Sequence, residues 1–142
     1  MPEAVESTSR AIQLRANYFE AWQSLGFYYN ELRSFRQASK AFQRALRIKP
    51  DDAQTHSGLA VADAGLRHYG NALKAAKKAT ELDPLLAVAH YNLAILYLVT
   101  GDQPMAFEAR RQLEGLDQNL ADRLATLLRS QFVINVTDLS SK

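Results

Sequence analysis

The sequence predicts an all-α fold, a solenoid of helix-turn-helix repeats, and three observations point to it. First, large and small residues recur with a fixed period of 34 residues over most of the chain. Second, within each period the apolar residues follow the spacing of a helix face rather than the alternation of a strand. Third, 47% of the 142 residues are hydrophobic, which is a normal value for a globular chain with a continuous core.

The first complete period shows the pattern most clearly. Its first half places four residues on one helix face, at i, i+3, i+4 and i+7: Trp22, Leu25, Gly26 and Tyr29. In its second half, Ala38, Phe42 and Ala45 take positions i, i+4 and i+7. Because the small residues let two backbones approach closely while the rings fill the space beside them, we expect an antiparallel helix pair.

The same positions recur further along the chain. The recurring sets are Leu25, Leu59 and Leu93; Gly26, Ala60 and Ala94; Ala38, Ala72 and Ala106; and Pro50 and Pro84. This pattern resembles the tetratricopeptide repeat, whose period is also about 34 residues. The resemblance covers three repeats, at residues 19–52, 53–86 and 87–120. The resemblance implies a right-handed superhelix whose first helices line a concave groove.

Flanking segments complete the expected organisation. Residues 1–18 resemble the second helix of a partial repeat, and residues 121–131 form an amphipathic helix that would cap the stack. Residues 132–142 show no clear helical period, so they are expected to be a disordered tail or the start of a further segment. If the partial repeat leaves one end of the stack open, the chain is expected to self-associate there.

Helix starts can be read at several points. Asn17 followed by Glu20, and Ser34 followed by Gln37, have the spacing of a capping box. We therefore expect the side chains of Asn17 and Ser34 to accept hydrogen bonds from the first turn of the helices that follow them.

The composition of the chain excludes several classes of function. The chain has no cysteine, so disulfides and thiol catalysis are excluded. The net charge of +2 gives no overall attraction to nucleic acid. The most apolar segment, residues 85–99, is too short and too polar to span a bilayer, so no membrane insertion is expected. We expect a soluble chain, cytoplasmic rather than secreted, that needs no cofactor.

The residues that could carry chemistry do not form a recognisable site. No two of His56, His68 and His90 stand at i, i+3 or i, i+4, so the spacing of a zinc site is absent. Asp63 takes a position that is normally apolar and buried, and His56 is a candidate partner for its carboxylate. Without a placed serine or a glycine-rich phosphate loop, the chain is not expected to be an enzyme.

The resemblance implies that a peptide or protein segment binds in the groove, and it assigns the groove residues by repeat position. These are Gln23, Phe27, Asn30, Gln54, Ser57, Val61, Ala64, Tyr91, Asn92, Ile95 and Leu98. The second repeat contributes small residues here, so the middle of the groove is expected to be hollow. Alternatively, Ile95 and Leu98 pack against the C-terminal helix or the tail and leave no pocket.

Two other functions remain open from the sequence. Basic residues gather on the second helices, at Arg36, Lys40, Arg44, Arg47, Lys74, Lys77 and Lys78, and could bind an anion such as nucleic acid or acidic lipid. Nucleic acid is the less expected of these, because no exposed aromatic residue accompanies the cations. The chain could also be a regulatory part of a larger enzyme.

Overall fold

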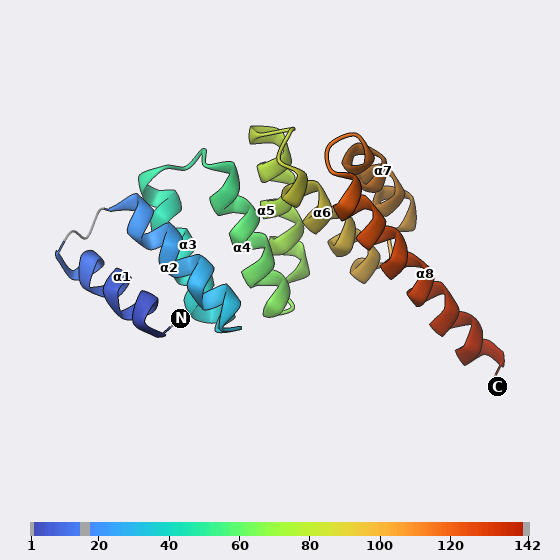
Figure 1. Cartoon of the computed structure of the whole chain (residues 1–142), viewed down its shortest axis with the longest axis horizontal. Coiled ribbons are helices and arrows are strands. Elements are labelled where there is room, and N and C mark those ends of the chain that lie inside the picture. Colours follow the sequence, from blue (N-terminus) through green and yellow to red (C-terminus); the bar gives the residue numbers. More distant parts are fainter. Residues whose placement is uncertain (1, 15–17, 141–142) are drawn as a thin grey trace.

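The computed structural model describes residues 2–14 and 18–140, which form eight helices and no strand. The helices are α1 (Pro2–Leu14), α2 (Phe19–Glu31), α3 (Phe35–Ile48), α4 (Ala53–Gly65), α5 (Tyr69–Leu82), α6 (Ala87–Thr100), α7 (Gln103–Glu114) and α8 (Gln118–Ser140). They follow one another in chain order along the long axis, with the two ends of the chain at opposite ends of the molecule (Figure 1). The expected all-α solenoid is confirmed.

Each helix packs mainly against its neighbours in the chain. The antiparallel pairs α2–α3, α4–α5 and α6–α7 form the repeats, α1 packs on α2, and α8 packs on both α6 and α7. The first helices of successive repeats also touch, α2 against α4 and α4 against α6. By contrast, α3 and α5 make no close backbone contact, and neither do α5 and α7, within the described residues. The layer of first helices is therefore the tighter, concave side, and the layer of second helices is the convex side.

The turn inside each repeat has one backbone geometry. Each contains one residue with a left-handed conformation: Arg33 (φ 58°), Arg67 (φ 62°) and Gly101 (φ 85°). In the first turn the N–H of Ser34 donates to the carbonyl of Tyr29 over 2.8 Å. The N–H of Arg33 donates to the carbonyl of Asn30 over 3.0 Å. These two bonds define a Schellman motif, and the other two turns repeat them, so the three helix pairs reverse direction in the same way.

The core between the helices is built from alanines and a few large side chains. Ala38, Ala72 and Ala106, which recur at the period of the repeat, are all buried. Phe42 is fully buried, and its ring lies against both Gly26 of α2 and Gly58 of α4. Small residues therefore allow close helix packing, as expected from the sequence.

Helix caps agree only in part with the sequence. Ser34 precedes α3, but its side chain makes no capping hydrogen bond. The expected cap at Asn17 lies outside the described residues. Three aspartates cap instead: Asp52 accepts from the N–H of Thr55, Asp102 from that of Met105 and Asp117 from that of Leu120.

The C-terminal helix is longer than the sequence suggested. We expected a capping helix at 121–131 and a separate tail at 132–142, whereas α8 runs from Gln118 to Ser140 without a break. The segment after Ser130 contains neither glycine nor proline, so nothing in it terminates a helix. Residues 141 and 142 lie outside the described part of the chain.

Two further expectations concern the surface. None of the helices in the described residues is both long and apolar enough to cross a membrane. The open end expected beside α1 involves Ala11 and Ile12, and the structure describes the backbone of these two residues but not their side chains, so self-association stays a prediction.

Candidate functional site

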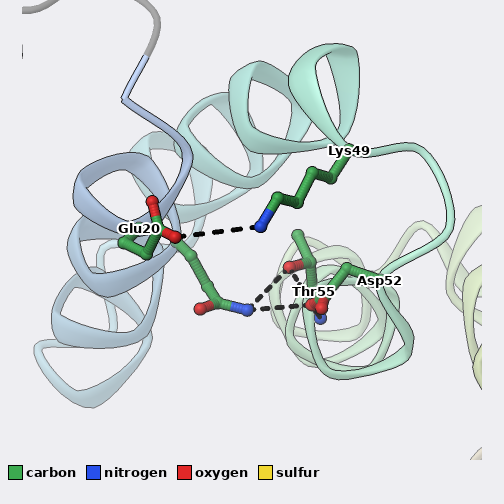
Figure 2. Close-up of polar contacts among 5 residues, drawn as sticks. Glu20, Lys49, Asp52 and Thr55 are labelled. Atoms are coloured by element: carbon green, nitrogen blue, oxygen red, sulfur yellow. Dashed lines mark hydrogen bonds and ion pairs between the residues drawn. The ribbon is translucent and has the colours of Figure 1, made fainter.

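Several polar residues assigned to the groove are used to join neighbouring helices. The side-chain amide of Gln23, on α2, donates to Oδ2 of Asp52 and to Oγ1 of Thr55, each over 2.9 Å. Asp52 in turn accepts from the backbone N–H and the hydroxyl of Thr55, at 2.9 and 2.6 Å (Figure 2). Close by, Lys49 and Glu20 form an exposed ion pair of 3.8 Å. Gln23 therefore ties α2 to the start of α4.

The two groove asparagines behave in the same way. Nδ2 of Asn30 donates to the backbone carbonyl of Gly58 over 3.0 Å, and Nδ2 of Asn92 donates to Oγ of Ser57 over 3.0 Å. These bonds join α2 to α4 and α4 to α6. Oδ1 of Asn30 is buried and has no hydrogen-bond partner in the described part of the chain. A side chain that satisfies its donor on a neighbouring helix has less capacity left for a ligand.

The apolar groove residues of the third repeat pack inside the protein. Tyr91, Ile95 and Leu98 are partly buried against the cluster that Ala94 forms with residues of α7 and α8, including Leu113 and Leu124. Arg123 of α8 also lies over the ring of Tyr91, 5.8 Å from its centroid. The C-terminal helix thus covers part of this end of the groove, as in the alternative that the sequence left open.

The remaining groove residues keep more of their surface. Phe27 is 37% exposed and Val61 is 38% exposed, and they hold equivalent positions of the first and second repeats. Phe27 is also held edge-on against the buried ring of Phe42, with 5.0 Å between centroids and 76° between planes. Gln54 is exposed and Ala64 is partly buried. Phe27 is therefore an anchored apolar side chain that still faces outward, and Val61 exposes a similar share of its surface.

The expected hollow in the middle of the groove is occupied in part by protein. Ser57 and Gly58 are buried, and a Cβ on Gly58 would meet the rings of both Phe42 and Phe27. The small residues of the second repeat thus make room for side chains of the first repeat.

A larger recess lies on the other side of the molecule, between α3 and α5. This cleft of about 990 Å³ has α4 as its floor. Its rim carries five cationic side chains: Arg36, Lys40, Lys74, Lys77 and Lys78. Sequence reasoning found these cations but not the cleft, nor its floor residues Ser39, Leu59 and Leu66.

One buried carboxylate lies in the floor of this cleft. Asp63 is 7% exposed and its Oδ1 accepts from Oγ of Ser39, on α3, over 3.3 Å. Burial raises the pKa of Asp63, while the hydrogen bond from Ser39 and the nearby His68 act in the opposite direction. The partner expected from the sequence, His56, is therefore wrong, because Ser39 of the adjacent helix supplies the contact.

The histidines have structural partners instead. Nε2 of His56 donates to the carbonyl of Pro50 over 2.8 Å, and Nε2 of His90 donates to that of Pro84 over 2.8 Å. The two histidines lie 34 residues apart, and so do the two prolines, so the two bonds are equivalent. They hold the loops that precede α4 and α6. The described residues contain no group of three side chains that could hold a metal ion.

Comparisons with known proteins bear on the family. Residues 19–52 and residues 75–108 each match a family profile described as tetratricopeptide repeat. The first match coincides with the first predicted repeat, and the second spans the end of the second repeat and the start of the third. A comparison with curated protein sequences gives no significant match.

Among solved structures, several of MamA resemble the chain. A MamA double mutant has a TM-score of 0.77 at 23% sequence identity, with 83% of this chain and 66% of that chain covered. A MamA fragment from Desulfovibrio magneticus RS-1 has the same TM-score and identity, with 83% and 67% covered. A further crystal structure of MamA has a TM-score of 0.76 at 16% identity, with 96% and 89% covered. At such identities the likeness establishes the fold alone, and the chain spans about two thirds of the first two.

The repeat type and the solenoid fold are both typical of a protein-interaction module. One family match covers α2 and α3, and the other runs from α5 into α7 across two successive repeats, so the chain belongs to the tetratricopeptide-repeat family.

Proposed function

We propose that the chain is a non-catalytic module that binds an extended segment of a partner polypeptide on its concave side, across Phe27 and Val61. The observation that carries the proposal is the pair itself. Two apolar side chains at equivalent repeat positions, 34 residues apart, each keep more than a third of their surface exposed. A third equivalent, Ile95, continues the row on α6, although α8 partly covers it.

The groove offers anchors of fixed position. Phe27 is braced by the buried ring of Phe42, so little side-chain freedom is lost when a ligand packs on it. The polar residues beside it, Gln23 and Asn30, are already bound to α4, and they hold the two first helices at a fixed spacing. Preorganised apolar anchors of this kind are common at the centres of protein interfaces.

A peptide selection tests this assignment. A random peptide library is selected on the immobilised chain, and a selected peptide is then titrated against the wild type and against Val61→Glu. Binding of that peptide should weaken at least roughly tenfold in Val61→Glu, because the variant places a charge in an apolar contact. The control is Leu85→Glu, which makes the same kind of change at a residue that is 76% exposed in the loop between α5 and α6.

The result separates the candidate surfaces. Equal affinities for wild type, Val61→Glu and Leu85→Glu would place the binding surface outside the Phe27–Val61 row. The melting temperature of each variant is measured beside the titration, and Val61→Glu must melt within a few degrees of the wild type for its loss of binding to count.

A further inference from the structure

The positive charge of the chain is concentrated on two neighbouring second helices. α3 has four cations and no acidic residue, and α5 has three cations and one acidic residue, Glu81. The next second helix, α7, is different. There Arg110 pairs with Glu114 over 3.3 Å, and Arg111 lies 3.9 Å from Glu108. The imbalance therefore belongs to the α3–α5 cleft rather than to the convex side as a whole.

The cations around the cleft form no ion pair with any described acidic side chain. The ion pairs among the described side chains are Glu20–Lys49 and the two pairs on α7, none of which involves a cleft residue. Lys77 is directed to the ring of Tyr97, 5.8 Å from its centroid. The others, on both walls, are Arg36 and Lys40 of α3 and Lys74 and Lys78 of α5. Two facing rows of unpaired cations attract an anion that lies between them.

The floor of the cleft indicates what kind of anion fits. Leu59, Leu66 and Ala75 provide apolar surface between the charged walls. No phenylalanine, tyrosine or tryptophan lines the described cleft, so nucleic-acid bases would find no stacking platform. A flat bilayer would meet the rims of the cleft but not its floor. A polypeptide can offer both carboxylates for the walls and aliphatic side chains for the floor.

We propose that the α3–α5 cleft is a second binding site, on the face opposite the groove, for an acidic segment of a partner polypeptide. Carboxylates of the segment pair with Lys40 on one wall and Lys74 and Lys78 on the other. Its aliphatic side chains pack on Leu59 and Leu66. The recess exists because α3 and α5 stay apart while the helix between them, α4, closes its base.

Fluorescence anisotropy with a defined probe tests the site. The probe is a fluorescein-labelled peptide of glutamate and leucine, titrated with the full chain and with the variant Lys40→Gln/Lys74→Gln. The control variant, Arg111→Gln/Arg129→Gln, removes the same charge from exposed positions on α7 and α8. The cleft variant should raise the Kd about tenfold, since each lost ion pair at a partly exposed site contributes modestly. The control should change it less than about twofold.

Three comparison probes complete the experiment. A peptide with serine in place of leucine should bind more weakly than the probe, because it offers nothing to the apolar floor. Oligothymidylate and phosphatidylserine vesicles should compete poorly with the probe. The proposal fails if the glutamate–leucine peptide does not bind, if both variants weaken it equally, or if oligothymidylate or the vesicles bind as tightly. Val61→Glu, on the other face, should leave this binding unchanged, so the two sites are judged separately.

Discussion

The ring of Phe42 occupies the space that a side chain on Gly58 would need. A Cβ built on Gly58 lies 2.5 Å from Cζ of Phe42, and one built on Gly26 lies 2.5 Å from Cε1 of the same ring. Phe42 comes from α3, whereas the glycines come from α2 and α4. A single ring, held between two glycines, therefore joins the first repeat to the second.

Gly58→Ala should destabilise the protein. The added methyl group must displace a fully buried ring, which costs about 1–3 kcal/mol, and this exceeds the gain of about 0.5–1 kcal/mol from replacing a helical glycine. Urea unfolding followed by circular dichroism measures the net loss. Gly70→Ala is the matched control: nothing in the structure lies within 4 Å of its added Cβ, so it should leave stability unchanged or raise it slightly. A stable Gly58→Ala variant would contradict the packing described for Phe42.

The left-handed turns predict opposite effects at equivalent positions. Gly101→Ala should lower the free energy of unfolding by about 1–2 kcal/mol, because φ of 85° is unfavourable for a residue with a Cβ. Arg67→Gly should raise it by up to about 1 kcal/mol, since arginine now bears that strain at φ 62°. Both are read from denaturant unfolding. If both substitutions changed the free energy of unfolding in the same direction, the two turns would not share one geometry.

Asp63 makes a pH-dependent contribution to stability. Because its pKa is raised in the folded protein, the unfolded chain releases this proton first, and the contribution of Asp63 is lost as pH rises from about 4 through the folded pKa. Asp63→Asn should therefore be more stable than the wild type at pH 7, and the difference should shrink towards pH 4. Urea midpoints across this range provide the measurement. An equal difference at both pH values would show that the ionisation of Asp63 is not responsible.

Asp52 supports both a helix start and a contact between repeats. Asp52→Ala removes the cap of α4 and leaves the amide of Gln23 with one acceptor fewer, so a loss of about 1–2 kcal/mol is expected. Asp51→Ala removes the same charge from the neighbouring exposed residue and should change stability by less than about 0.5 kcal/mol. Thermal melts of the two variants at equal ionic strength give the comparison, and equal losses would assign the effect to net charge.

The sequence could predict the helix pairs because each repeat places the same kinds of residue at the same buried positions. Ala38, Ala72 and Ala106 recur because each is buried, at a position with room for only a small side chain. Phe42 and Gly58 were each visible in the sequence, but their contact was not, because it joins different repeats. For that reason the small residues of the second repeat were interpreted as a hollow in the middle of the groove.

The candidate sites depend more on distances between helices, which a repeat pattern does not specify. Gln23 and Asn92 stand at positions that face the groove, yet each reaches a neighbouring first helix instead of a ligand. The partner of Asp63 was sought at His56, two turns and about 10 Å along the same helix. The actual partner, Ser39, is on the adjacent helix, at a separation no single-helix pattern reveals. The cleft likewise follows from the distance between α3 and α5.

The unequal layers of the solenoid make its bending one-sided. Close backbone contacts join α2 to α4 in the inner layer, whereas α3 and α5 have none between them. A change in the separation of α3 and α5 would therefore tilt one repeat against the next about the inner layer, and it would alter the distance between Phe27 and Val61. The curvature of the molecule would thus set both the width of the α3–α5 cleft and the spacing of Phe27 and Val61.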